Sequence, residues 1–104
     1  MTILINTDHN IIESESMRGN LITYISGEMK RFSEHITRIE VHLSDENGNK
    51  EGQNDKRCLL EARLEGMQPI AVSSNADTTE LAVEGAVTKI QTSLDTILGR
   101  LKKY

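Results

Sequence analysis

The sequence predicts a single α+β domain over residues 1–104, with the element order β-α-β-β-β-α and two helices packed on one face of a four-stranded sheet. Two observations predict this fold. Apolar and polar residues alternate over 36–43 and again over 57–65, which is typical of a β-hairpin with one buried face. Apolar residues recur at spacings of three and four over 17–32 and 81–101, which is typical of amphipathic helices.

The N-terminal part predicts a strand followed by a helix. Residues 2–7 (TILINT) alternate in the way of a short strand. Ser14 has the side chain of a helix N-cap and precedes the amphipathic stripe over 17–32. We expect Lys30 and Arg31 in the last turn of this helix, where cations interact favourably with the helix dipole.

The two central strands are predicted to pair across a long polar turn at residues 44–55. One set of alternating side chains is expected to face the core: Ile39, Val41, Leu43, Cys58, Leu60, Ala62 and Leu64. The other set is expected to form an open sheet face, as antiparallel sheets allow: Arg38, Glu40, His42, Arg57, Leu59, Glu61 and Arg63.

The C-terminal part predicts a further strand and a second helix. Residues 70–74 continue the meander after a turn, and Pro69 suits the start or the edge of that strand. Residues 77–80 (DTTE) resemble a capping box with Asp77 as the N-cap of a helix that runs to about residue 101. The small residue Gly85 predicts that this helix lies close to the sheet.

The composition indicates a cytoplasmic protein without a membrane partner. The single cysteine, Cys58, cannot form an internal disulfide, which fits a reducing compartment. The N-terminus has neither the basic region nor the apolar run of a signal peptide. No apolar stretch approaches the ~18 residues of a membrane-spanning helix.

No group of residues indicates catalysis, a cofactor or a metal site. The segment from Asp45 begins like a calcium loop, but Lys50 and Lys56 stand where glycine and a bidentate glutamate are needed. Nucleophile, phosphate-loop and dinucleotide motifs are absent from the sequence. The histidines lack the spacing of a helical zinc site: His9, His35 and His42. We therefore expect no enzyme activity, no cofactor and no small-molecule substrate.

Four segments carry a resemblance to a known family: residues 14–18 (SESMR), 32–48 (with ITRIEVHLSDENG), 55–63 (DKRCLLEAR) and 77–86. Together with the order β-α-β-β-β-α, they resemble the hibernation-promoting-factor family of ribosome-associated proteins, also called sigma-54 modulation proteins. The resemblance covers nearly the whole chain.

The resemblance implies a function in ribosome storage. It implies that the chain binds RNA of the small ribosomal subunit, in the channel used by messenger and transfer RNA. Binding there would block translation and hold ribosomes inactive under stress. The resemblance also implies a short form, without the C-terminal dimerisation domain of some family members.

The charge of the chain departs from the family pattern, which places lysines and arginines against ribosomal RNA. The formal net charge is −4, whereas a basic domain is the usual footprint of a nucleic-acid binder. About six to ten cations would nevertheless suffice for binding if they shared one surface. The candidate RNA-binding residues are Arg38, His42, Lys56, Arg57, Arg63, Lys30, Arg31, Lys89, Arg100, Lys102 and Lys103.

Local interactions alone could account for several of these cations. Those near helix C-termini are favoured by the helix dipole, and Arg38 could pair across strands with Glu61 or Glu65. RNA contact is favoured for five residues, since the outward sheet face otherwise has little purpose: Arg38, His42, Lys56, Arg57 and Arg63. The competing hypothesis is a protein-interaction module of the same fold without RNA binding, and a small enzyme is a third.

Overall fold

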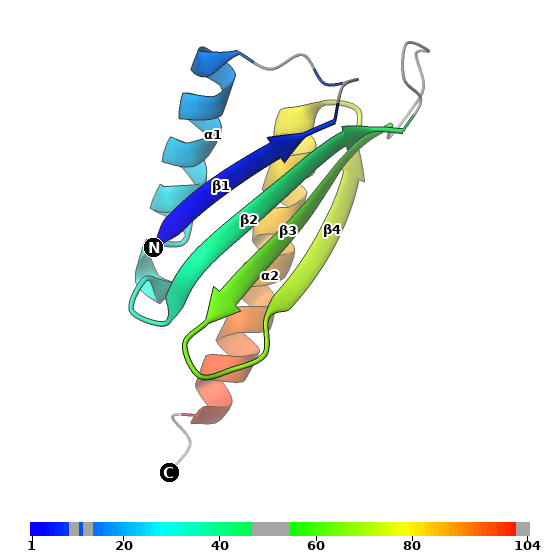
Figure 1. Cartoon of the computed structure of the whole chain (residues 1–104). Coiled ribbons are helices and arrows are strands. Elements are labelled where there is room, and N and C mark those ends of the chain that lie inside the picture. The colour runs from blue at the N-terminus through cyan, green and yellow to red at the C-terminus, as the bar shows by residue number, and fades with distance from the viewer. Residues whose placement is uncertain (9–10, 12–13, 47–54, 102–104) are drawn as a thin grey trace.

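The computed structural model describes residues 1–8, 11, 14–46 and 55–101. Of residues 100 and 101 it describes the backbone only. Its elements, in chain order, are β1 (Thr2–Thr7), α1 (Glu15–Glu28), the 3-10 turn η1 (Lys30–Phe32), β2 (Ile36–Asp45), β3 (Lys56–Leu64), β4 (Ile70–Ala76) and α2 (Thr79–Leu101). The predicted α+β class and the order β-α-β-β-β-α are confirmed (Figure 1).

The four strands form one sheet in the order β1-β2-β3-β4. Strand β1 runs parallel to β2, and the β2–β3 and β3–β4 pairs are antiparallel. The sheet is therefore mixed; the sequence predicted the antiparallel hairpin and meander but not the direction in which β1 pairs. A parallel pair needs a long crossover connection, which α1 supplies here.

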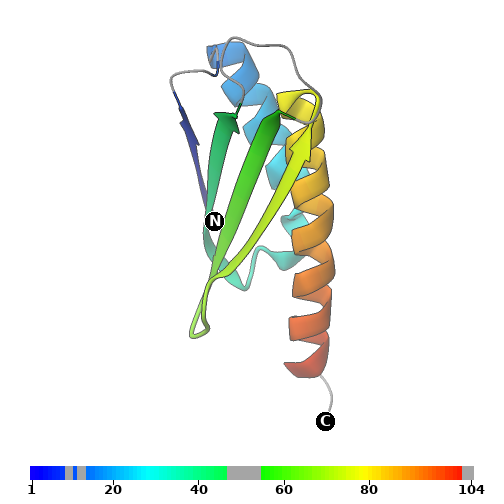
Figure 2. The ribbon, with the colours of Figure 1, turned by 90° about the vertical axis from the view of Figure 1, so that its right-hand side faces the viewer.

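Both helices lie on the same side of the sheet, as the views in Figure 1 and Figure 2 agree. Inward side chains of β2 and β3 meet the apolar stripes of the helices, and all seven predicted inward residues of the hairpin are buried. Fully buried side chains such as Ile25, Ile39 and Leu60 each contribute roughly 1.5–3 kcal/mol of hydrophobic stabilisation. The described segments place no helix on the other side of the sheet.

Helix α1 begins as predicted and ends earlier than predicted. The Ser14 hydroxyl accepts a hydrogen bond from the Met17 amide at 3.0 Å, which makes Ser14 the N-cap. The helix stops at Glu28, and Lys30 and Arg31 lie in η1 instead of its last turn. The Gln91 side chain of α2 donates to the Glu28 carbonyl at 2.9 Å and so satisfies one carbonyl at the helix end.

Helix α2 begins one residue later than the capping-box prediction. Thr78, not Asp77, is the N-cap, because its hydroxyl accepts a hydrogen bond from the Leu81 amide at 3.1 Å. The close approach predicted at Gly85 is confirmed, since a Cβ placed there would lie 2.2 Å from the Ser74 Oγ of β4. Within the described part of the chain, neither helix is long and apolar enough to cross a membrane.

Candidate nucleic-acid interface

The uncovered side of the sheet forms a charged surface built from all four strands. We call it the open sheet face. The strand register places Leu4, Glu40, Glu61 and Ala71 in one row across the sheet. The next rows bring together the remaining outward side chains: Thr2, Arg38 and Arg63; Asn6, His42, Leu59 and Ser73; Ser44, Arg57 and Asn75. All seven residues predicted for this face lie on it.

The edge positions of the open sheet face were not predicted from the sequence. Leu4 and Asn6 come from β1, and Ser73 and Asn75 come from β4. Their alternation is visible in the sequence, but the side on which each edge strand pairs is not. Leu4 is 43% exposed, so the face has an apolar side chain beside its charged centre.

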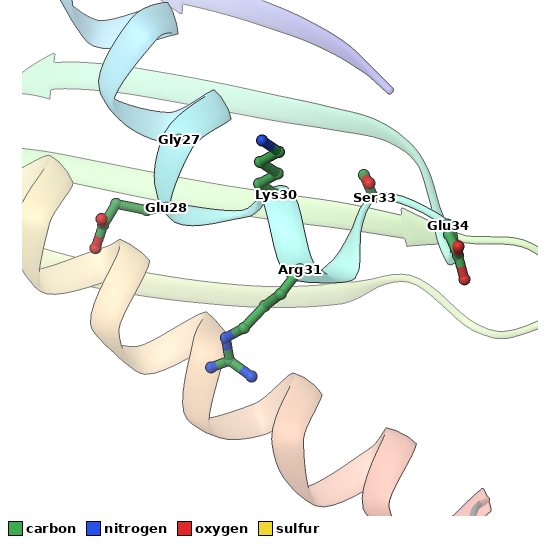
Figure 3. A pocket seen from close by; sticks show the side chains of 6 residues that line it. All are labelled: Gly27, Glu28, Lys30, Arg31, Ser33 and Glu34. Atoms are coloured by element: carbon green, nitrogen blue, oxygen red, sulfur yellow. The ribbon is translucent and has the colours of Figure 1, made fainter.

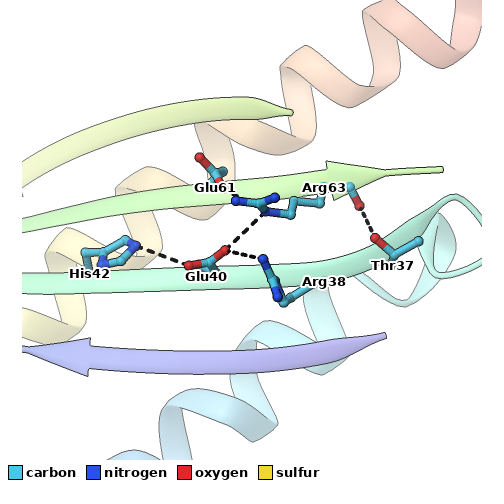
Figure 4. A network of polar contacts seen from close by, with 6 residues as sticks. All are labelled: Thr37, Arg38, Glu40, His42, Glu61 and Arg63. Atoms are coloured by element: carbon cyan, nitrogen blue, oxygen red, sulfur yellow. Dashed lines mark hydrogen bonds and ion pairs between the residues drawn. The ribbon is translucent and has the colours of Figure 1, made fainter. Parts of the chain in front are cut away.

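Ion pairs around one carboxylate occupy the centre of the open sheet face (Figure 4). Glu40 accepts from Arg38 Nη2 at 2.9 Å and from Arg63 Nε at 3.2 Å, and His42 Nε2 lies 3.8 Å from its other oxygen. Arg63 Nε also lies 3.1 Å from Glu61 Oε1. We call these five residues the Glu40 network. Arg38 thus pairs with Glu40 on its own strand, and the predicted pairing with Glu61 or Glu65 is wrong.

Arg57 is held less tightly than the arginines of the Glu40 network. Its Nε lies 3.8 Å from Glu46 Oε1, which is beyond hydrogen-bond distance. The same Glu46 oxygen accepts a hydrogen bond from Asn75 Nδ2 at 3.1 Å. Glu46 therefore has another partner, and the Arg57 guanidinium can turn towards a ligand at little cost.

Lys56 lies on the helix-covered side of the sheet, and its predicted grouping with the open sheet face is wrong. It alternates in phase with the buried residues Cys58 and Leu60. Its Nζ lies 3.1 Å from Asp45 Oδ2 and 3.1 Å from Asp55 Oδ1, and both carboxylates are buried. Hydrogen bonds to Asp55 and Asp45 raise the pKa of Lys56, so its charge is already neutralised locally.

Arg31 is also occupied. Its guanidinium forms a forked pair with the Asp95 carboxylate of α2, with Nη2 to Oδ2 at 3.0 Å, and lies 4.0 Å above the centroid of the Phe32 ring. The hydrogen bond to Asp95 raises the pKa of Arg31, and the same bond lowers the pKa of Asp95. Figure 3 shows Arg31 extending towards α2 beside a shallow hollow, while Lys30 points away from α2.

The remaining candidates lie apart from the sheet face. Lys30 is exposed in η1, and Lys89 of α2 donates to the Ser73 carbonyl at 2.7 Å. Neither pairs with a carboxylate of the described residues. The Arg100 side chain, Lys102 and Lys103 lie outside the described residues. The structure therefore gathers Arg38, His42, Arg57 and Arg63 on one surface and leaves Lys30, Arg31, Lys56 and Lys89 away from it.

The described residues carry neither a metal-binding cluster nor a reactive cysteine. No three His, Cys, Asp or Glu side chains of the described segments gather in a way that could hold a metal ion. The Cys58 thiol is fully buried, and burial raises its pKa to about 12, so the thiolate needed for nucleophilic chemistry does not form near neutral pH.

A helical layer on one side of the sheet and an open, charged sheet face on the other define a small two-layer α+β domain. A family model described as sigma 54 modulation protein / S30EA ribosomal protein matches residues 7–102. The chain belongs to this family, and membership places it among ribosome-associated factors.

Two solved structures have the same fold. One is the N-terminal domain of Protein Y from Thermus thermophilus, with a TM-score of 0.72 and 18% identity over 93% of this chain and 99% of that one. The other is a ribosomal subunit interface protein from Coxiella burnetii, with a TM-score of 0.72 and 17% identity over 95% and 99%. No curated protein sequence matches the chain.

Proposed function

We propose that this chain is a hibernation factor that binds RNA of the small ribosomal subunit, in the channel used by messenger and transfer RNA. In the cytoplasm, it would hold ribosomes inactive by occupying that channel, without acting as an enzyme. The family match over residues 7–102 is the observation that carries this proposal. The Coxiella burnetii relative is a ribosomal subunit interface protein, which supports the same kind of partner.

We assign the RNA contact first to the open sheet face. Arg38, His42, Arg57 and Arg63 share this surface, and their side chains are between 40% and 46% exposed. An ion pair between exposed side chains contributes only about 0–1 kcal/mol, but the Glu40 side chain is just 18% exposed. RNA phosphates would therefore have to replace Glu40 as the partner of the arginines, and neighbouring phosphates of one RNA strand could compete for both.

Contact from the other candidates requires different conditions. The contact would extend beyond the sheet face if it included the candidates that lie elsewhere: Lys30, Lys89, Arg100, Lys102 and Lys103. Arg31 would have to leave Asp95, and Lys56 would have to leave two buried carboxylates. A buried carboxylate that loses its partner carries a high desolvation cost, so Lys56 ranks last among the candidates.

The proposal predicts binding to small subunits that depends on salt. Affinity of a labelled chain for purified small subunits is measured at several salt concentrations, alone and with messenger RNA as a competitor. The double variant Arg38→Ala/Arg63→Ala is expected to reduce the slope of log affinity against log salt by about 1 to 2. Arg18→Ala on α1 removes one positive charge away from the sheet face, so it is the control for Arg38→Ala and Arg63→Ala measured singly.

The second candidate function is a protein-interaction module of the same fold. The carboxylate partners of Arg38, Arg63, Lys56 and Arg31 favour it, because they leave few cations for phosphate. This function predicts an affinity for its partner that is flat in salt and unaffected by messenger RNA. The same titration therefore separates the two candidates.

A further inference from the structure

A hollow of about 270 Å³ lies on the open sheet face, at the end where β1 stops. Side chains of three strands line it, with Asn6 from β1, His42 and Ser44 from β2, and Arg57 and Leu59 from β3. The register places His42 beside Asn6 and opposite Leu59, and places Ser44 opposite Arg57. Ser44 is short, so it leaves space between the longer side chains of His42 and Arg57.

The side chains around the hollow differ in chemistry in a way that suits one kind of ligand. Leu59 supplies an apolar surface, and the His42 imidazole supplies a flat ring. Asn6 and Ser44 carry donors and acceptors of hydrogen bonds, and Arg57 carries a positive charge. Unpaired RNA bases are recognised by this combination of stacking, hydrogen bonds to the base edge and contact with the adjoining phosphate.

The two basic side chains of the hollow, His42 and Arg57, are also the least engaged basic side chains of the open sheet face. His42 and Arg57 each lie 3.8 Å from a carboxylate oxygen, whereas Arg38 and Arg63 lie 2.9 Å and 3.2 Å from Glu40. Among the described residues that line the hollow, Asp8 is the one with a carboxylate, and it accepts a hydrogen bond from the Asp45 amide at 3.3 Å. That carboxylate is tied to the backbone at the rim of the hollow.

We propose that this hollow binds a single unpaired nucleotide of RNA. The base lies against Leu59 and the His42 ring, Asn6 and Ser44 meet its edge, and the Arg57 guanidinium contacts its phosphate. The hollow is smaller than the roughly 300–1,000 Å³ of ordinary ligand pockets, which limits it to one nucleotide. The inference rests on the proposed function and deepens it, because it names a single-stranded segment as the RNA that the sheet face recognises.

A single phosphate contact gives binding at the hollow a distinctive salt dependence. One phosphate contact to single-stranded RNA changes log affinity by about 0.7 per tenfold change in salt. Binding of a short oligonucleotide should therefore weaken only slightly with salt, while binding to whole subunits should weaken steeply.

The test is an NMR titration of the ¹⁵N-labelled full chain with single-stranded pentaribonucleotides of adenosine or uridine. Amide shifts are expected to change at Asn6, His42 and Leu59. His42→Ala and Arg57→Ala are each expected to weaken binding at least about fivefold, and His42→Phe is expected to keep the stacking contact and the affinity. Arg18→Ala, which removes a cation from α1, should bind as the unaltered chain does.

The outcomes separate this inference from the proposed function. Shift changes confined to the helices, or equal affinity of His42→Ala and the unaltered chain, would overturn the nucleotide site even if small subunits still bind. Oligonucleotide binding at the hollow together with no binding to small subunits would support the site and contradict the proposed function. Dispersed spectra of each variant establish that it folds, so a loss of binding reports on the hollow.

Discussion

Arg63 on β3 donates from Nε to Glu40 on β2 at 3.2 Å, across the centre of the open sheet face. The same Nε lies 3.1 Å from Glu61, which stands directly opposite Glu40 in the strand register. Like charges in directly opposed positions destabilise a sheet, and Arg63 offsets this repulsion. One arginine therefore joins two glutamates, and the central cations of the face are partly neutralised before any ligand arrives.

Removal of the central carboxylate should strengthen RNA binding. Glu40→Gln frees Arg38 and Arg63 from their shared partner, so affinity for small subunits at low salt should rise about two- to fivefold, the equivalent of one exposed ion pair. The change is measured by fluorescence anisotropy of a labelled chain. Glu34→Gln makes the same charge change away from the sheet face, and an equal effect in both variants would mean that Glu40 has no local role.

The Arg31–Asp95 pair should stabilise the fold only above acidic pH. Arg31 lowers the pKa of Asp95 in the folded chain below the ordinary value of 3.8. When the pKa of a carboxyl group is lower in the folded chain than in the unfolded chain, the group stabilises the fold. This stabilisation has its full value above the unfolded pKa and is lost as the pH falls through the folded pKa. The free-energy difference between the unaltered chain and Asp95→Asn should therefore be constant from about pH 7 to about pH 5 and shrink below about pH 4. Urea unfolding at each pH measures this difference, and a difference that grows towards low pH would contradict the pairing.

The hairpin and its open face could be predicted because alternation in the strands reports directly which side chains share a side. Ile39 and Cys58 were correctly placed inside, and Arg38 and Arg57 outside, from this period alone. Lys56 was misplaced because it stands at a strand end and was grouped by its charge instead of its position in the period. Its alternation with Cys58 was a usable signal.

The ion pairs could not be predicted from the sequence. The Arg31–Asp95 pair joins residues 64 positions apart and depends on how η1 packs against α2. The parallel pairing of β1 with β2 also depends on which sheet edge the crossover reaches. At the start of α2, Asp77 and Thr78 are both good N-cap residues, and only the position of the Leu81 amide distinguishes them.

The Cys58 thiol should be unreactive in the folded chain. Burial raises its pKa to about 12, and it is the single cysteine, so any labelling reports on this residue. A disulfide reagent at about pH 8 should label the native chain roughly 10³-fold or more slowly than the chain in urea. Labelling of the native chain at the unfolded rate would mean that this part of the core is open.

The same thiol predicts a loss of stability at high pH. The pKa of this thiol is higher in the folded chain than its ordinary value of about 9. Below about pH 9 the thiol is protonated in both states and does not affect the free energy of unfolding. Above that pH only the unfolded chain ionises, so the folded chain becomes less stable. The free energy of unfolding of the unaltered chain, minus that of Cys58→Ala, should therefore decrease between about pH 8 and about pH 10.5. A difference that is independent of pH would contradict the assigned burial.

The close contact between α2 and β4 should appear as coupling between Gly85 and Ser74. Gly85→Ala gains about 1 kcal/mol of helix propensity, but its Cβ would meet the Ser74 hydroxyl, and overpacking costs about 1–3 kcal/mol. Ser74→Ala removes that hydroxyl. Gly85→Ala should therefore be more favourable by about 0.5–3 kcal/mol in the Ser74→Ala chain than in the unaltered chain. A double-mutant cycle measured by urea unfolding gives this coupling, and strict additivity would rule out the contact. Gly27→Ala on α1, where a Cβ meets no neighbouring atom, is the matched control.

Sedimentation with purified ribosomal subunits tests the central claim most directly. The full chain is mixed at low salt with small subunits or with large subunits and separated on a sucrose gradient. We predict that the chain migrates with the small subunit, is released as the salt concentration rises, and is displaced by messenger RNA. A chain that stays at the top of the gradient at low salt, or migrates with the large subunit alone, would contradict the account.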